Sequence, residues 1–232
     1  MISTEGFKII RSEDFTSYQT ANSKKIIFWD TCGILDILNL ISDSTNSTFI
    51  SVLIKLNKKI TQGEILSCSS KIVIREILDN YSNPPYYQAG KFIDETVRNF
   101  NKIQSYLKEL GQQDSYEEVT INSEAILSIL ESQIQLLLNN TLFIDDDDYL
   151  KLARDRVVSK IAPSQRNEFK DSIIWETCID IAKKSELEIY FISSNEKDYG
   201  KSGNRFIEIQ SDMDENNIIF KHKITDFYTI VQ

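Results

Sequence analysis

Five acidic residues stand where predicted strands end, where predicted helices begin, or on a partly buried helix face. They are Asp30, Glu76, Asp171, Glu196 and Asp198. Carboxylates gathered at one place could not all be ionised without a counter-ion. Oxygen ligands without histidine suit Mg²⁺ or Mn²⁺ better than Zn²⁺. We therefore expect these acids to hold a hard divalent cation.

Other kinds of chemistry lack the residues that they need. The chain has one histidine, His222, and three cysteines that are scattered singly along it. This set is too small for a zinc site of the usual kind. It also excludes Ser-His-Asp and Cys-His catalysis unless His222 itself serves, and its surroundings suggest a strand end. The seven glycines form neither a dinucleotide-binding fingerprint nor a Walker-type phosphate loop.

The length and charge of the chain limit the classes of protein that it can be. It has 232 residues, of which 35 are acidic and 26 basic, so the formal net charge is −9. A chain of this length predicts one domain, residues 1–232, with a large core. The bulk charge excludes a polybasic nucleic-acid or membrane-surface protein. Isolated thiols, no export signal and no apolar run of membrane-spanning length predict a cytoplasmic protein.

Strands and helices alternate in the first part of the chain. The run Lys24–Asp30 predicts a buried parallel strand that ends in the first acid. A helix over 32–42, a helix over 46–60 and a strand over 64–68 follow. Ser69 and Ser70 then offer caps for a helix from residue 71 that carries Glu76. Strand-end acids and helix-start acids of such a chain meet at one edge of a parallel sheet.

The rest of the chain predicts a helical layer and then the second part of the sheet. Residues 89–163 have a helical pattern and no convincing strand, which predicts a helical insertion. A helix over 167–185 is followed by strands over 188–193, 206–209 and 218–220, and by a short helix from Thr225. Residues 1–23 predict an irregular arm. The predicted fold is α/β, a three-layer α/β/α domain with a mostly parallel sheet built from residues 24–80 and 165–232.

Each acid also has a structural explanation. Asp171 could only cap its helix, Asp30 could form a turn, and Glu76 could pair with Arg75 or a neighbouring lysine. Glu196 and Asp198 could be ordinary loop acids. The run Asp145–Asp148 could bind a cation, although a solvated helix start is favoured. The shared order and placement of the five acids at the ends of elements favours a common site.

Two motifs in the last third of the chain resemble a known family. Lys170-Asp171-Ser-Ile-Ile-Trp175-Glu176 and Phe191-Ile-Ser-Ser-Asn195-Glu196-Lys-Asp198-Tyr199 are similar to the "KDxxIWE" helix and "TNxKDF" loop of larger PIN-like nucleases. The strand ending at Asp30 and the helix carrying Glu76 fit the same pattern. The resemblance covers residues 24–80 and about 165–232.

The resemblance implies a Mg²⁺- or Mn²⁺-dependent endoribonuclease. It makes Asp30, Glu76, Asp171 and one of Glu196 or Asp198 the catalytic and metal-binding residues, because Glu196 replaces an aspartate of the family loop. Glu176 is an auxiliary ligand or a surface acid. Alternatives are a PIN-like module that binds RNA or protein with little turnover, and a phosphatase or structure-specific DNA nuclease with the same acids. A toxin or defence role fits the leading interpretation.

Basic residues near the last two acids suggest where a polyanion would bind. Residues 151–170 carry six basic and two acidic side chains, and Lys197, Lys201 and Arg205 flank the last loop. Contacts to phosphate need such a rim, although an ordinary solvated helix face has the same composition. The expected substrate contacts are Ser194, Asn195, Lys197, Arg166 and Lys170. The expected partners are single-stranded RNA and either a second copy or an inhibitory protein, with no membrane.

Overall fold

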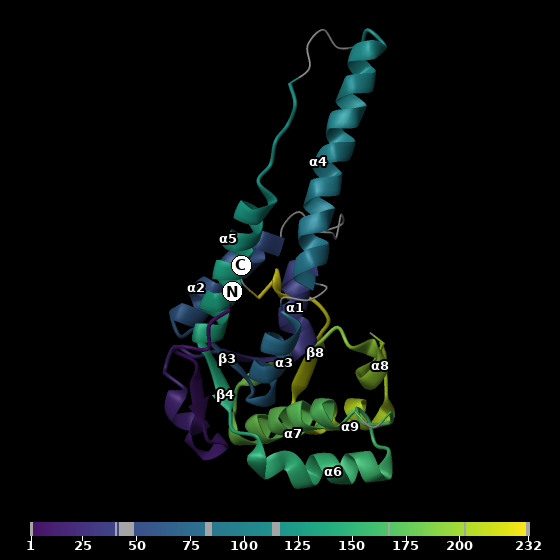
Figure 1. Cartoon of the computed structure of the whole chain (residues 1–232). Coiled ribbons are helices and arrows are strands. Elements are labelled where there is room, and N and C mark those ends of the chain that lie inside the picture. The colour runs from purple at the N-terminus through teal and green to yellow at the C-terminus, as the bar shows by residue number, and fades with distance from the viewer. Residues whose placement is uncertain are drawn as a thin grey trace.

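The computed structural model contains a parallel sheet between layers of helices, with a long helix that projects from one end (Figure 1). It describes residues 2–39, 41, 49–81, 85–112, 117–166, 168–201 and 203–230. Among these residues, no helix is both long enough and apolar enough to cross a membrane. The sheet positions the candidate site, and the projecting helix is considered separately below.

Six strands form the central sheet in the order β1-β4-β3-β2-β5-β8, and all five neighbouring pairs are parallel. Their bounds are β1 Lys8–Ile10, β2 Lys25–Trp29, β3 Ile65–Ser70, β4 Thr141–Ile144, β5 Glu188–Ile192 and β8 Ile218–Lys221. A small antiparallel pair, β6 Gly200–Lys201 and β7 Asn204–Arg205, lies outside this sheet. The prediction of an α/β/α fold is confirmed, and the central sheet is wholly parallel.

Helices cover both faces of the sheet. The helices α1 Thr31–Asn39, α2 Phe49–Thr61 and α5 Ser123–Asn139 lie on one side, and α7 Phe169–Lys184 and α9 Ile207–Asn216 lie on the other. The helix α6 Leu150–Ser159 packs outside α7, and α3 Ile72–Asn80 contacts both α1 and α7. The remaining helices are α4 Pro85–Glu109 and α8 Glu196–Tyr199, with short 3₁₀ segments at Ser12–Tyr18, Asp147–Tyr149 and Ile224–Phe227.

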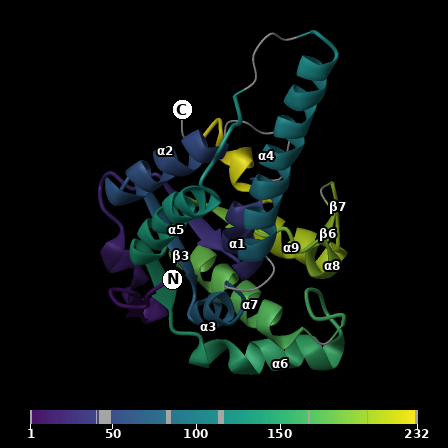
Figure 2. The same ribbon diagram turned by 45° about the horizontal axis from the view of Figure 1, so that its top comes forward.

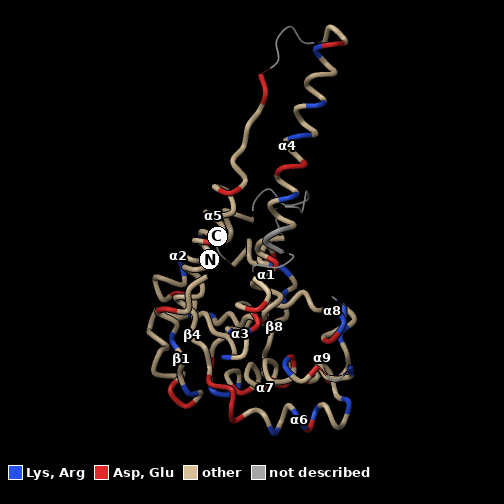
Figure 3. Tube along the Cα trace, viewed as in Figure 1, with Lys and Arg blue, Asp and Glu red and all other residues tan. Residues whose placement is uncertain are grey.

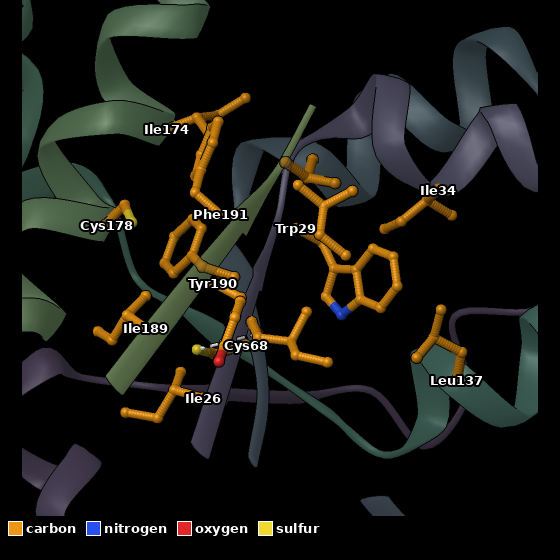
Figure 4. Packing of buried hydrophobic residues seen from close by; sticks show 14 of the residues in the cluster. Ile26, Trp29, Ile34, Cys68, Leu137, Ile174, Cys178, Ile189, Tyr190 and Phe191 are labelled. Atoms are coloured by element: carbon orange, nitrogen blue, oxygen red, sulfur yellow. Dashed lines mark hydrogen bonds between the residues drawn. The ribbon is translucent and has the colours of Figure 1, made fainter. Parts of the chain in front are cut away.

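The central strands are apolar on both faces because helices cover both faces. In β2, Ile26, Ile27, Phe28 and Trp29 have no exposed surface. Figure 4 shows Trp29 directed towards Ile34 of α1 and Leu137 of α5, while Phe191 is directed towards α7. The indole nitrogen of Trp29 donates a hydrogen bond of 2.9 Å to the Ser67 hydroxyl, so the buried polar atom of this ring has a partner.

The sequence patterns did not predict the strands β1 and β4, so the predictions for the two segments that contain them are wrong. The predicted helical stretch 89–163 contains β4, which pairs with β3 and lies inside the sheet. The predicted irregular arm 1–23 contains β1, which pairs with β4 and forms the edge of the sheet. These strands have only four and three residues. Runs so short carry no distinct period, and their strand conformation comes from pairing with neighbours distant in sequence.

Two local predictions are also wrong. Residues 206–209 do not form a strand, because the helix α9 begins at Ile207 and the short strand β7 ends at Arg205. Ser69 and Ser70 do not cap α3, because both belong to β3. The carboxylate of Asp146 instead accepts the backbone N–H of Ile72 at 2.6 Å and the Ser70 hydroxyl at 2.6 Å. A residue 74 positions away therefore satisfies the start of this helix.

The helix α4 projects beyond the body of the molecule, and residues 117–122 return alongside it (Figures 1 and 2). Only its first turns pack on the body, where Ala89 and Ile93 form a small apolar cluster with Leu127 of α5. Two hydrogen bonds between the Asn101 side chain and the backbone of Val119 hold the returning segment to the helix. We call α4 together with residues 117–122 the arm.

Candidate active site

Asp30 follows the last residue of β2 at the carboxyl edge of the sheet. Its backbone N–H donates to the Ile192 carbonyl at 3.0 Å, which ties the end of β2 to the end of β5. The carboxylate accepts hydrogen bonds from the Thr31 N–H at 2.7 Å and from the Ser193 hydroxyl. Burial raises the pKa of Asp30 to about 7 against the Ser193 hydrogen bond, and Glu76 raises it further. Asp30 is therefore a fixed, buried acid with a like charge beside it.

Gly33 allows α1 to start next to the end of β5. A Cβ atom at this position would lie 2.7 Å from the Ile192 carbonyl oxygen, which is closer than real contacts allow. The first turn of α1 can therefore approach β5 only because residue 33 has no side chain. This approach brings Asp30 and Thr31 close to Ser193.

Glu76 reaches the same place from α3. Its carboxylate accepts the Thr31 hydroxyl at 2.5 Å and pairs with Lys170 of α7 at 3.1 Å. Its partner is thus a lysine from a distant helix, while the adjacent Arg75 pairs with Asp79 on the exposed side. Three elements that are far apart in the sequence meet at this side chain.

Asp171 and Asp198 form the other half of the acid group. Asp171 lies in the first turn of α7, but the capping position belongs to Glu168, so Asp171 is not merely an N-cap. Burial raises the pKa of Asp171 to about 9, and the charges of Asp30, Asp198 and Glu76 add to the rise in that order. Among the described residues, its carboxylate accepts one long hydrogen bond, 3.4 Å, from the Asn195 amide. Asp171 is therefore the acid with the strongest need for a positive partner.

Asp198 is buried in α8, and its Oδ1 atom has no hydrogen-bond partner in the part of the chain that the structure describes. A buried carboxylate oxygen without a donor is costly unless something outside the described protein atoms satisfies it. Asp198 also lies close enough to Asp171 to raise its pKa. A divalent cation bound by these carboxylates would satisfy the Asp198 oxygen, so the residues present fit such an ion.

A cavity of about 440 Å³ opens between these elements, and its walls include Asp30, Thr31, Glu76 and Asp171. Cys32 also lines it, and burial together with the neighbouring acids raises the pKa of this thiol, so it stays protonated. In the described residues, no three acids of this site bring their carboxylate oxygens within 4.8 Å of one another. The cavity therefore holds separated acids and has room between them.

Glu196 does not join this group. Its side chain is exposed, and its charge raises the pKa of Arg205 and of His222, partly offsetting the larger effect of burial. Glu196 and Asp198 are two residues apart in α8, and two residues correspond to roughly half a turn of helix, so the two side chains point in nearly opposite directions. Of the two acids expected from the sequence, Asp198 is therefore the one that lies with Asp30, Glu76 and Asp171.

Glu176, the expected auxiliary ligand or surface acid, belongs to a different network. It forms an ion pair with Arg156 of α6, whose guanidinium also binds Asp212 of α9 at 2.7 Å and the Ala162 carbonyl at 2.6 Å. The Trp175 indole donates to the same Asp212 carboxylate at 2.8 Å. The structure thus gives Glu176 a role in fastening α6, α7 and α9 together.

Asp145, Asp146 and Asp147 form the one tight acid cluster among the described residues. Lys71 pairs with Asp145 at 2.9 Å and with Asp147 at 3.9 Å, and Asp146 caps α3 as described above. The pKa of Asp145 is lowered, chiefly by the Lys71 hydrogen bond. Lys71 and the backbone N–H of Ile72 are therefore already partners of these acids.

The polar residues expected to contact substrate fall into two groups. Lys170 pairs with Glu76, and Asn195 donates to Asp171, so both touch the acids directly. Arg166 and Lys197 are exposed, and Ser194 is half-buried. Sequence reasoning missed Thr31 and Ser193, whose hydroxyls hold Glu76 and Asp30. The sequence does offer a sign of their role, because Thr31 directly follows Asp30 and Ser193 directly follows β5.

Comparison with known proteins gives one match. A family model described as a PIN domain matches residues 27–199, which is about three quarters of the chain and includes all the acids of the site. No curated protein and no solved structure matches the chain. PIN domains are generally nucleases and typically bind divalent metals. The wholly parallel sheet, the acids at its carboxyl edge and this match agree, and the chain belongs to the PIN-domain family.

Proposed function

We propose that the protein is an endoribonuclease that needs Mg²⁺ or Mn²⁺ and hydrolyses single-stranded RNA. The observation that supports this most is a group of buried acids for which the described residues supply no counter-ion. Asp30, Asp171 and Asp198 come from three parts of the chain. Burial, and then the charges of neighbouring acids, raise the pKa of Asp30 and of Asp171, and Asp198 keeps an unsatisfied oxygen among the described residues. A protein gains no stability from such a group, so a function that requires it is the simplest account.

In this proposal Asp30, Asp171 and Asp198 bind the cation, and Glu76 orients it or the attacking water. A bound divalent ion lowers the pKa of water and stabilises charge on a phosphate. The protein fixes its own ligands: Thr31 and Ser193 hold the Asp30 carboxylate, and Thr31 holds Glu76. Lys170 already neutralises Glu76 and is more than half exposed, so it can also meet a substrate phosphate.

RNA as the substrate rests on the resemblance of the motifs and on the exposed basic residues beside the acids. Arg166, Lys170 and Lys197 are exposed and lie within five residues of Asp171 or Asp198 in the sequence, and Lys170 contacts Glu76 directly, so phosphates could meet them there. A role as a toxin or defence effector and an action in the cytoplasm stay predictions. Arrest of growth on expression, relieved by Asp171→Asn, is the result expected for a toxin.

The proposal is tested with end-labelled single-stranded RNA and DNA of one sequence, each with EDTA, Mg²⁺ or Mn²⁺. We expect internal cleavage of RNA that needs the metal, and a loss of about 10²–10³ in rate for Asp171→Asn, as for removal of one electrostatic stabiliser. Asp94→Asn on the arm is the matched control and should cleave at the wild-type rate. Thermal unfolding with and without Mn²⁺ gives a second readout, because an ion that binds only the folded state raises the Tm.

Each result has a defined meaning. Cleavage of DNA but not RNA would replace the ribonuclease with a deoxyribonuclease that uses the same acids. A rise in Tm with Mn²⁺ and no cleavage of either polymer would indicate a metal-binding module without nuclease activity. Wild-type cleavage by a folded Asp171→Asn protein would overturn the assignment of the site.

A further inference from the structure

Arg205, which ends the short strand β7, is a half-buried cation whose side chain is held by three neighbours. Its guanidinium carbon lies 3.6 Å from the ring centroid of Phe220, within the range of a cation–π contact. One terminal nitrogen donates to the Gly200 carbonyl, and the other forms a hydrogen bond of 2.5 Å with the His222 ring. These neighbours come from β6, from β8 and from the residue after β8, so the guanidinium has a fixed direction.

The His222 ring is able to accept the hydrogen bond from Arg205. Burial, followed by the charge of Arg205, lowers the pKa of His222 below its usual value, so the ring is neutral near pH 7. A neutral ring with its proton on Nδ1 leaves Nε2 as an acceptor. The Asp226 carboxylate accepts the backbone N–H of His222 at 3.0 Å and that of Lys223 at 3.2 Å, which fixes the chain at this point.

Gly200 allows the hairpin of β6 and β7 to pack against the end of α8. Its φ is +82°, and a Cβ atom there would lie 2.8 Å from the Phe206 nitrogen and 2.9 Å from the Arg205 Cα. A residue with a side chain would therefore be strained and would push β7 away. Because residue 200 is glycine, Arg205 lies beside the helix that carries Asp198.

One group of aromatic rings positions both Arg205 and an acid of the site. The ring of Phe220, on which Arg205 stacks, lies 5.6 Å from the Tyr199 ring. Tyr199 has no exposed surface, and its hydroxyl donates to the backbone carbonyl of Asp171 at 3.3 Å. Packing of these rings therefore fixes where Arg205 lies relative to Asp171.

The strand order places Arg205 and its partners at the same edge of the sheet as the acids. The Asp30 N–H donates to the Ile192 carbonyl, and the Ser193 N–H donates to the Lys221 carbonyl at 3.1 Å. The strands β2, β5 and β8 therefore end side by side. Two strand spacings, about 10 Å, separate Asp30 from the end of β8. A nucleic-acid strand bound at the acids can thus reach Arg205 with another of its phosphates.

The neighbours of Arg205 orient its charge without neutralising it. In the part of the chain that the structure describes, no ion pair joins Arg205 to an acid, and the charge of Glu196 acts on it only at longer range. Burial lowers the pKa of Arg205 to about 10, and Glu196 offsets only part of this change. A guanidinium has five N–H donors, of which Gly200 and His222 engage two. The others can bind an anion.

We propose that Arg205 binds a phosphate of the RNA backbone beyond the one held at the acids, and that Phe220 and His222 position its guanidinium for this contact. The proposal rests on the nuclease function given above. A planar guanidinium grips phosphate with two parallel N–H groups, and stacking on a ring leaves its edge available. Lys197 and Lys201 are exposed on the same loop, and Figure 3 shows basic residues in the region of α8.

The first test measures binding of fluorescent single-stranded RNA to the Asp171→Asn protein in EDTA by anisotropy at several salt concentrations. Adding Arg205→Gln should weaken binding about tenfold and reduce the logarithmic salt slope by about 0.7, the share of one phosphate contact. Adding Arg98→Gln, on an exposed residue of the arm, is the matched control and should change neither quantity. An unchanged affinity and slope for Arg205→Gln, or no measurable binding by the parent protein, would overturn the proposal.

Arg205→Lys separates the charge from the structure of the hairpin. It keeps the charge but loses the planar pair of donors, so it should restore the salt slope of the parent protein and only part of the affinity. A loss of slope equal to that of Arg205→Gln would mean that the hairpin, and not the charge, is responsible, and would overturn the proposal. Far-ultraviolet circular dichroism and urea unfolding show whether each variant is folded.

The second test identifies the phosphate with strands of about six nucleotides, each carrying one uncharged methylphosphonate linkage at a different position. At one position the neutral linkage should weaken binding to the parent protein and have little effect on Arg205→Gln, because that contact is already lost. Equal losses for both proteins at every position would exclude the contact. Neither test uses cleavage. Binding that depends on Arg205 without cleavage by the wild type would refute the nuclease alone, and cleavage without this dependence would refute the contact alone.

Discussion

Asp198 and Glu196 lie two residues apart in one short helix, yet their carboxylates have opposite surroundings. Asp198 is buried with an unsatisfied oxygen and repels Asp171, while Glu196 is exposed and attracts Arg205. Successive positions of a helix point in different directions, so of two acids that are two residues apart one can face the sheet edge and the other solvent. The roles of the two acids can be separated by substitution.

Asp198→Asn should lower the rate of metal-dependent RNA cleavage by about 10²–10³, because it removes one buried charge that is directed at the other acids. Glu196→Gln should retain wild-type cleavage within about threefold, because its charge acts only on exposed or half-exposed groups. Initial rates with labelled RNA at saturating Mn²⁺ measure both. Loss of activity in Glu196→Gln with a wild-type rate for Asp198→Asn would reverse the assignment.

At the scale of elements, the site depends on how closely α1 approaches the end of β5. Gly33→Ala should destabilise the protein by about 2 kcal/mol, because its Cβ would meet the Ile192 carbonyl at 2.7 Å and force the helix away. The shift would also move Asp30 and Thr31, so cleavage should fall more than stability alone explains. Urea unfolding and initial rates measure the two effects.

Gly90→Ala is the control for that substitution, because Gly90 also lies in a helix and its Cβ would meet only the flexible end of Leu127 at 3.2 Å. It should leave stability unchanged or raise it by about 0.5 kcal/mol, because alanine favours helix. Equal effects of the two glycine substitutions would mean that the approach of α1 to β5 is not constrained at Gly33.

The helices α6, α7 and α9 are fastened together by Arg156, whose side chain is 11% exposed. Arg156→Ala should lower the free energy of unfolding by about 2 kcal/mol, because Glu176 and Asp212 would be left half-buried without their cation. Arg154→Ala, on a side chain that is 65% exposed, should change it by less than about 0.5 kcal/mol. Urea unfolding provides the comparison.

The same network predicts that Glu176 does not bind the cation. Glu176→Gln should lower stability but keep the full rise of Tm with Mn²⁺, because the acids around the cavity are unchanged. A Glu176→Gln protein that is stable but no longer responds to Mn²⁺ would make this residue a ligand, as the sequence first allowed.

At the scale of the whole molecule, the net charge of −9 repels RNA, so RNA can bind only where basic side chains are concentrated locally. Exposed basic residues close to Asp171 and Asp198 in the sequence include Arg166, Lys170, Lys197 and Lys201. If each meets one phosphate, the affinity of Asp171→Asn for single-stranded RNA should fall with salt at a logarithmic slope of about −3. Fluorescence anisotropy at several salt concentrations measures this slope.

Substitution of single cations locates the contacts. Adding Lys197→Gln should reduce the slope by about 0.7, the share of one phosphate contact on a single strand. Adding Lys108→Gln, far along the arm, should leave the slope unchanged. An equal effect of both would mean that RNA is bound by the general charge of the molecule and has no preferred path beside the acids.

The sequence by itself determined the strands β2, β3, β5 and β8 and the acids at the ends of these elements. A strand that is buried on both faces needs a continuous apolar run, and the first acid after that run shows where the strand ends. The strand and the acid at its end can therefore both be predicted from neighbouring residues in the sequence. The family motifs at Asp171 and Asn195 are local for the same reason. The acids named in advance therefore include all four that the structure brings together.

Only the tertiary structure decided which partners those side chains have. It placed β1 and β4 in the sheet, gave Asp198 and not Glu196 to the acid group, and gave Glu176 to Arg156. It also left several large apolar side chains of α4 exposed, among them Phe100 and Ile103. Burial and pairing depend on residues far apart in the chain, and local propensity carries no information about which distant residue will arrive.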